Sequence, residues 1–149
     1  MGKVILLVED NPQDEHLMLR AFRKLTPSEF VVAHDGAEAL DYINGTGQYA
    51  QRRPGLPSLV LLDLRLPRID GLEVLKRIRA SERTRKLPVV IFSGSSAGED
   101  KVRSYAFGAT AYVQKPVSFD EFVEAAEALW RLWQQLESGT SMGEEKCGS

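Results

Sequence analysis

The stretch that decides the fold is VILLVEDNP, residues 4–12 of a 149-residue chain. Residues 4–8 are continuously apolar, as expected for a strand buried on both faces of a parallel sheet. Glu9 and Asp10 end that run, and Asn11-Pro12 then supplies an N-cap residue and a proline suited to the first helical position. The stretch therefore predicts a buried strand that delivers two carboxylates to the turn before a helix.

Short apolar runs and amphipathic stretches alternate in the same way to about residue 136. The expected strands are residues 4–8, 30–33, 59–62, 87–92 and 111–113. The expected helices lie at about 12–25, 35–44, 70–78, 98–105 and 118–136. Five strands alternating with five helices predict an α/β fold, a doubly wound (βα)5 five-stranded parallel sheet. We expect one domain over residues 1–137 and a disordered tail over residues 138–149.

The composition excludes several classes of function. A formal net charge of −2 gives no electrostatic footprint for nucleic acid. The apolar runs are strand-length and too short to span a bilayer, and the first residues lack the apolar core of a signal peptide. The single cysteine, Cys147, cannot form an internal disulfide. We therefore expect a cytoplasmic protein that binds neither nucleic acid nor membrane.

Polar side chains gather where the predicted strands end, at the edge where open parallel sheets bind ligands. The strands deliver to that edge Glu9, Asp10, Asp63, Ser93 and Lys115. Neighbouring carboxylates repel one another unless a cation compensates, and oxygen ligands without His or Cys favour Mg²⁺. An aspartate can act as the nucleophile in covalent phosphoryl transfer, with a hydroxyl and an amine binding the phosphoryl oxygens. These residues predict a Mg²⁺-dependent phosphoryl-transfer site.

The motifs resemble a known family when they are taken together. The segments LVEDN at 7–11, LLDLRLPRIDG at 61–71, Ser93-Gly94 and Lys115-Pro116 are similar to the receiver domain of two-component response regulators. The resemblance covers roughly residues 3–135 and implies the flavodoxin-like receiver fold. It also implies that the chain accepts a phosphoryl group from a sensor histidine kinase, and that it is no enzyme beyond slow self-dephosphorylation.

The resemblance assigns a role to each matching residue. Asp63 corresponds to the phosphoacceptor. Glu9 and Asp10 correspond to the acidic pair that, with Asp63 and the backbone carbonyl of Arg65, holds Mg²⁺. Ser93 and Tyr112 correspond to the switch hydroxyl and the switch aromatic. These roles imply that phosphorylation changes the surface formed by helix four, strand five and helix five.

The lysine segment carries two further expectations from the family. Lys115 corresponds to the lysine that pairs with the phosphoryl group, and the Lys115-Pro116 bond is expected to be cis. The loop at 46–57 and the long last helix are similar to single-domain regulators paired with bacterial phytochromes. That likeness implies a bacteriophytochrome kinase as partner and a homodimer through the last helix. The candidate dimer face comprises Phe122, Trp130 and Trp133.

Simpler interpretations stay open for some of these residues. Tyr112, on a short strand, is also typical of a core aromatic, and the tryptophans fit helix packing as well as a partner surface. The basic residues between Lys76 and Lys86 fit a solvated face or a docking site for the kinase.

Three other functions are compatible with this fold class. A phosphatase of the haloacid-dehalogenase type would carry a second Asp where Arg65 stands, and a flavin carrier would need a Ser/Thr/Gly-rich loop after the first strand. The sequence argues against both. An interaction module that keeps the site without being phosphorylated stays open.

Overall fold

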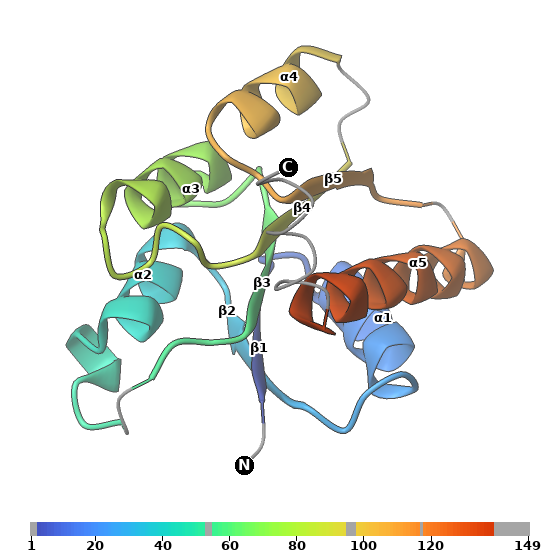
Figure 1. Cartoon of the computed structure of the whole chain (residues 1–149), viewed down its shortest axis with the longest axis horizontal. Coiled ribbons are helices and arrows are strands. Elements are labelled where there is room, and N and C mark those ends of the chain that lie inside the picture. Colours follow the sequence, from blue (N-terminus) through green and yellow to red (C-terminus); the bar gives the residue numbers. More distant parts are fainter. Residues whose placement is uncertain (1–2, 53–54, 95–97, 117, 139–149) are drawn as a thin grey trace. The chain divides into compact units, whose positions relative to one another are not determined.

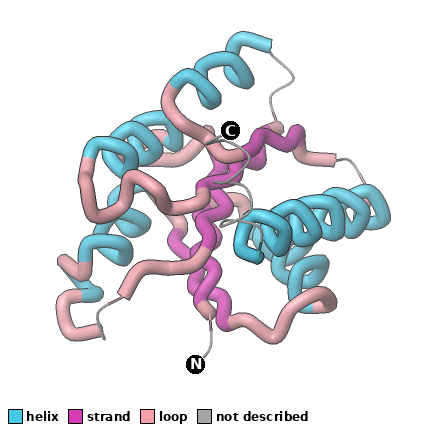
Figure 2. The backbone as a smooth tube through the Cα atoms, in the orientation of Figure 1, coloured by secondary structure: helices cyan, strands magenta, loops and turns pink. Residues whose placement is uncertain are grey.

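The computed structural model describes residues 3–52, 55–94, 98–116 and 118–138, and residues 139–149 of the predicted tail lie outside them. The chain packs as two compact units, residues 1–16 with 28–115, and residues 17–27 with 116–149. Figure 1 labels the elements, and Figure 2 colours helices and strands. In chain order they are β1 (Val4–Val8), α1 (Pro12–Arg23), β2 (Glu29–Ala33), α2 (Gly36–Asn44), η1 (Gly47–Tyr49), β3 (Leu59–Asp63), α3 (Gly71–Ala80), β4 (Val89–Ser93), α4 (Gly98–Ala106), β5 (Ala111–Gln114) and α5 (Phe119–Ser138).

The first unit is built on a five-stranded parallel sheet in the order β2-β1-β3-β4-β5 (Figure 1). This order confirms the predicted α/β fold with strands and helices in alternation. The direction of strand order reverses between β1 and β3, which makes their carboxyl ends the expected ligand-binding edge. In the register of these two strands Val8 is opposite Leu62, so Glu9 and Asp63 follow as neighbours on adjacent strands.

Both faces of the sheet are apolar and buried. On one face, side chains from alternate strand positions pack with α2 and α3 into one hydrophobic core. This core includes Leu6, Val8, Val60, Leu62, Ile91, Ile43, Leu75 and Ile78. Intervening residues such as Ile5, Leu7 and Leu61 are buried as well. Burial on both faces explains why β1, β3 and β4 are continuously apolar instead of alternating.

Cap residues lie at the starts of four helices, including the predicted cap Asn11. The side chains of Asn11, Asp35, Asp70 and Ser118 each accept a hydrogen bond from a backbone N–H two or three residues later. These bonds satisfy N–H groups that the first helical turn leaves without a partner. The cap at Asn11 matters for function because it fixes the start of α1 directly after Glu9 and Asp10.

The segment after α2 forms a compact cluster, hereafter the α2 cluster, of Glu38, Tyr42, Tyr49 and Arg52. The Arg52 guanidinium carbon lies 4.0 Å from the centre of the Tyr42 ring, and Arg52 Nε donates to the Tyr42 carbonyl at 3.0 Å. The Tyr49 ring meets Tyr42 edge-on at 5.0 Å, and its hydroxyl donates to Glu38 at 3.0 Å. Part of the predicted polar loop at 46–57 is therefore ordered by aromatic and charged contacts.

The second unit joins the later part of α1 to α5. The Arg20 guanidinium lies 4.3 Å from the centre of the Phe119 ring, at the first residue of α5. The buried face of α1 includes Met18, Ala21 and Phe22, which follow an i, i+3, i+4 pattern. Among the described residues, no helix has both the length and the apolar character needed to cross a membrane.

The dimer face expected on α5 needs correction. Phe122 is 2 % exposed and Trp133 is 4 % exposed, so neither is available as an anchor for a second chain. Trp130 is partly exposed and stacks edge-on against Trp133, with ring centres 4.7 Å apart. A stripe of large apolar residues on a helix is ordinarily buried in its own chain, and that is what these two residues do. The homodimer itself stays a prediction.

Candidate functional site

Three carboxylates meet at the carboxyl ends of β1 and β3, as the sequence predicted. Oxygen atoms of Glu9, Asp10 and Asp63, hereafter the carboxylate cluster, all lie within 4.8 Å of one another. Glu9 and Asp10 follow β1 directly, and Asp63 is the last residue of β3. The parallel register that places Val8 opposite Leu62 is what brings them together.

Two of these carboxylates are buried. Glu9 is 0 % exposed and Asp63 is 5 % exposed, while Asp10 faces solvent. Glu9 Oε2 accepts the Asn11 backbone N–H at 3.2 Å, and Asp63 Oδ1 accepts the Arg65 backbone N–H at 3.2 Å. The turns after β1 and β3 thus hold one oxygen of each buried acid and leave the other oxygen for the cluster.

Lys115 brings positive charge to the same place from the residue after β5. Its Nζ lies 2.8 Å from Glu9 Oε1, 2.8 Å from Asp14 Oδ2 and 3.1 Å from Asp63 Oδ2. The contacts with Asp63 and Glu9 join the lysine to the cluster as expected. Asp14, in the first turn of α1, is a partner that the sequence analysis did not identify.

The electrostatics of the site follow from burial and from the charges that lie close together in it. Burial raises the pKa of Glu9 to about 8, with the nearby charge of Asp63 acting in the same direction and Lys115 opposing both. Burial alone would lower the pKa of Lys115, but its hydrogen bond to Asp14 and the nearby carboxylates of Glu9 and Asp63 outweigh burial and raise it. The lysine is therefore charged at neutral pH, while Glu9 is protonated in most of the metal-free population at pH 7.

The turn after β3 explains the spacing of the LLDLRLPRIDG segment, residues 61–71, in physical terms. A side chain at Gly71 would overlap the backbone carbonyl oxygen of Asp63, so only glycine permits this close approach of α3 to the end of β3. Arg68 adopts a left-handed conformation, with φ 69°, and its Nε lies 3.2 Å from Asp35 Oδ2. Asp70-Gly71 is thus a structural cap and turn that set the position of Asp63.

The two expected switch residues lie on β4 and β5. Ser93 ends β4 and is fully buried, one residue beyond Phe92, which pairs with Asp63 in the sheet. Tyr112 on β5 is partly buried and packs against the hydrophobic core, and its backbone N–H donates to the Tyr105 hydroxyl at 3.1 Å. The switch roles of Ser93 and Tyr112 stay predictions.

Comparison with known proteins decides the family. The profile of the response regulator receiver domain matches residues 5–127. The chain belongs to the response regulator receiver family. Rcp1, a response regulator from Synechocystis sp. strain PCC 6803, is 32 % identical over 132 residues, which are 88 % of this chain and 88 % of Rcp1.

Solved receivers share the fold over nearly the whole described chain. The phosphorylated cyanobacterial phytochrome response regulator RcpA matches with a TM-score of 0.83 and 35 % identity, over 90 % of this chain and 95 % of RcpA. The bacteriophytochrome response regulator AtBRR matches with a TM-score of 0.74 and 50 % identity, over 85 % of this chain and 91 % of AtBRR. The Mn²⁺-bound form of Rcp1 matches with a TM-score of 0.80 and 30 % identity, over 89 % and 94 % of the two chains.

One expectation for this receiver is contradicted at Lys115-Pro116. The described residues contain no cis peptide bond, so this bond is trans. Trans is the lower-energy form of an X-Pro bond by roughly 0.5–1 kcal/mol, and a cis bond needs surrounding contacts to select it. A local sequence motif does not contain those contacts.

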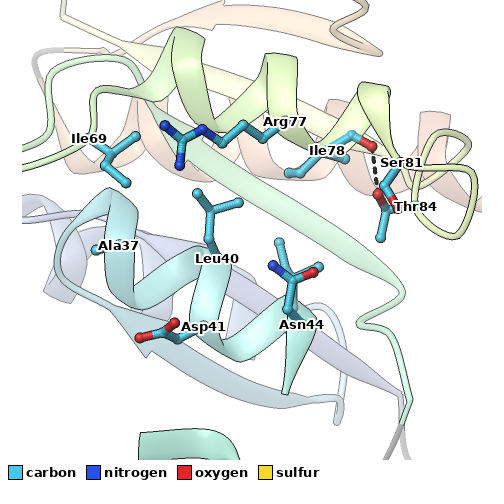
Figure 3. Close-up of a pocket in the computed structure, with 10 residues that line it drawn as sticks. Ala37, Leu40, Asp41, Asn44, Ile69, Arg77, Ile78, Ser81 and Thr84 are labelled. Carbon is cyan, nitrogen blue, oxygen red and sulfur yellow. Dashed lines mark hydrogen bonds between the residues drawn. The ribbon is translucent and has the colours of Figure 1, made fainter. Parts of the chain in front are cut away.

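Two cavities of the receiver differ in their relation to the site. One, of about 500 Å³, opens beside the carboxylate cluster and is lined by Asp10, Arg65, Asp100 and Arg103 among others. The other, of about 330 Å³, lies between α2 and α3, where Leu40 and Ile69 face Arg77 (Figure 3). The second contains none of the cluster residues, whereas the first is lined in part by Asp10.

The residues of the carboxylate cluster fit a divalent cation. When ionised, the three acids of the cluster and Asp14 carry four negative charges, and Lys115 contributes one positive charge. Glu9 Oε1 is fully buried and accepts no hydrogen bond among the described residues, although Lys115 lies close to it. An excess of carboxylates with only oxygen ligands is the donor set that Mg²⁺ prefers, and receiver domains bind Mg²⁺ at such an acidic pocket.

Proposed function

We propose that this receiver accepts a phosphoryl group on Asp63 from the phosphohistidine of a sensor histidine kinase, in a Mg²⁺-dependent reaction. One observation carries the proposal: a buried aspartate lies beside two further acids and 3.1 Å from a partly buried lysine. Structural ion pairs are ordinarily balanced, whereas this site has an excess of negative charge at the entrance of a cavity.

Phosphoryl transfer requires a nucleophile, groups that bind the phosphoryl oxygens, and residues that hold the metal. A carboxylate oxygen of Asp63 attacks phosphorus, the P–N bond of phosphohistidine breaks, and the electron pair leaves on the imidazole, which takes up a proton. Lys115 pairs with the transferred negative charge, and the Ser93 hydroxyl donates to a phosphoryl oxygen. Glu9, Asp10, Asp63 and the backbone carbonyl of Arg65 would hold Mg²⁺, which supplies positive charge for the phosphoryl oxygens.

The phosphorylated state then acts as a signal. We infer that Ser93 and Tyr112 move together when the phosphoryl group is in place, and that their movement biases α4, β5 and α5 between two states. Slow hydrolysis of the acyl phosphate resets the receiver. The proposed domain spans residues 1–137, acts in the cytoplasm and forms a homodimer through α5.

The upstream partner belongs to the same proposal. RcpA and AtBRR are response regulators of phytochromes by name, and their likeness to this chain supports a bacteriophytochrome histidine kinase as the phosphoryl donor. Nothing in the proposal requires nucleic acid or membrane.

The test is phosphotransfer from a purified, autophosphorylated bacteriophytochrome histidine kinase. The wild-type receiver should take up the phosphoryl group within minutes in the presence of Mg²⁺ and fail to do so after chelation. Asp63→Asn should fold normally and take up none, because the amide cannot serve as the nucleophile. Uptake that persists in Asp63→Asn would contradict the proposal. Failure of phytochrome and other histidine kinases alike would favour an interaction module that works without phosphorylation.

A further inference from the structure

Asp14 differs from an ordinary acid in the first turn of a helix. Such acids commonly point into solvent and complement the helix dipole. The Asp14 side chain is only 25 % exposed, and its Oδ2 accepts a hydrogen bond from Lys115 at 2.8 Å across 101 residues of sequence. The neighbouring Glu15 belongs to the same turn and its side chain is equally exposed, but it pairs with the exposed His34, so the partner is what distinguishes Asp14.

The position of Asp14 is fixed from its own backbone. Its N–H donates to Asn11 Oδ1 at 3.0 Å, within the N-cap of α1. The same cap residue directly follows Glu9 and Asp10, so the turn that delivers the metal-binding acids also sets Asp14. The carboxylate of Asp14 lies outside the carboxylate cluster, yet it shares Lys115 with Glu9 and Asp63.

Lys115 and a bound divalent cation would contact the same two acids, Glu9 and Asp63. Lys115 Nζ is within 3.1 Å of the two buried acids that would hold Mg²⁺. A cation bound by Glu9 and Asp63 would repel the ammonium, and a buried ammonium without a partner is costly. Asp14 offers Lys115 a carboxylate that the cation does not use.

We propose that Asp14 is a positioning residue for Lys115, and that it keeps the ammonium at the site when Glu9 and Asp63 bind a divalent cation. The inference rests on the proposed function, since it assigns a role within the same phosphoryl-accepting site. Asp14 thereby permits the metal and the lysine to be present together, which phosphoryl binding requires. Without it, Lys115 competes with the metal for the same two acids.

The first test is calorimetric titration with MgCl₂. Asp14→Asn should bind Mg²⁺ about tenfold more weakly than wild type, because Lys115 then stays on Glu9 and Asp63. Glu15→Gln removes the same charge from the same helical turn and should change the affinity by less than about twofold. In a Lys115→Ala background, Asp14→Asn should have only that small effect. Equal losses in the two backgrounds, or equal effects of Asp14→Asn and Glu15→Gln, would overturn the proposal.

The second test follows the lysine itself by nuclear magnetic resonance. In wild type the Lys115 ammonium signal should remain visible after saturation with Mg²⁺, because a carboxylate still holds it. In Asp14→Asn the signal should disappear on Mg²⁺ addition, and Asp14→Glu should restore part of it. A signal that survives in Asp14→Asn at saturating Mg²⁺ rules out the positioning role.

The outcomes separate this inference from the proposed function. If the wild-type protein binds Mg²⁺ and accepts phosphoryl, but Asp14→Asn weakens Mg²⁺ binding no more than Glu15→Gln does, only the role of Asp14 is contradicted. A wild-type protein that binds no Mg²⁺ contradicts both.

Discussion

The carboxylate cluster and the α2 cluster both place charged groups against buried surface, yet they differ in balance. In the α2 cluster, Arg52 stacks on Tyr42 and donates to backbone carbonyls, and Glu38 accepts from the Tyr49 hydroxyl. Its charges and polar groups have partners. In the carboxylate cluster, three acids crowd together and Lys115 is shared with a fourth, Asp14. In this molecule, an excess of acids over positively charged partners marks the functional site. Charged groups that each have a partner mark a structural cluster.

The largest expected effect is on metal binding by Asp10→Asn. Asp10 is exposed and belongs to the proposed ligand set, so its loss should weaken Mg²⁺ binding about a hundredfold. The metal-free variant should unfold at a slightly higher temperature than wild type, because one of three crowded like charges is gone. Calorimetric titration and thermal unfolding measure the two quantities. If Asp10→Asn bound the metal more weakly but also unfolded at a lower temperature, the carboxylate cluster would stabilise the fold as the α2 cluster does, and the contrast in charge balance would not hold.

The converse change in the α2 cluster should affect stability alone. Arg52→Ala removes a cation–π contact and hydrogen bonds to the Tyr42 and Gly55 carbonyls. We expect a loss of about 2 kcal/mol in the free energy of unfolding, measured by chemical denaturation. Mg²⁺ affinity should equal that of wild type. A change in metal affinity would show that the two clusters are coupled.

The smallest expected effect is a pH dependence that belongs to the carboxylate cluster. The pKa of Glu9 is raised to about 8 by burial, so the metal-free site binds a proton at pH 7 that Mg²⁺ must displace. Apparent Mg²⁺ affinity should therefore rise about tenfold from pH 6 to pH 7 and level off above pH 8. Glu9→Gln should bind Mg²⁺ weakly and without this dependence. A wild-type affinity that is flat between pH 6 and pH 8 would mean that Glu9 is already ionised.

Local signals were enough to predict most of the fold. Continuous apolar runs gave β1, β3 and β4, because burial on both faces leaves that pattern in the sequence itself. Cap residues gave the starts of α1, α2 and α3, because a cap hydrogen bond spans only two or three residues. Boundaries were less certain: β4 begins at Val89, two residues later than expected, and α1 ends at Arg23.

What the sequence analysis missed depends on distant partners. Asp14 resembled any acid of a first helical turn, and only the contact with Lys115 gives it a role. The burial of Phe122 and Trp133 and the trans bond before Pro116 likewise depend on packing that no local motif records. By contrast, Glu9, Asp10 and Asp63 could be grouped in advance, since parallel strands deliver their last residues to one edge.

The most direct test of the central claim is to locate the phosphoryl group. The receiver would be phosphorylated in Mg²⁺ by its kinase or by a small phosphodonor, reduced with borohydride, digested and sequenced by mass spectrometry. Borohydride converts an aspartyl phosphate to homoserine, so the account predicts homoserine at position 63 alone. Homoserine at another position, or phosphoryl uptake with Asp63 unmodified, would contradict the claim that Asp63 in the carboxylate cluster is the phosphoacceptor.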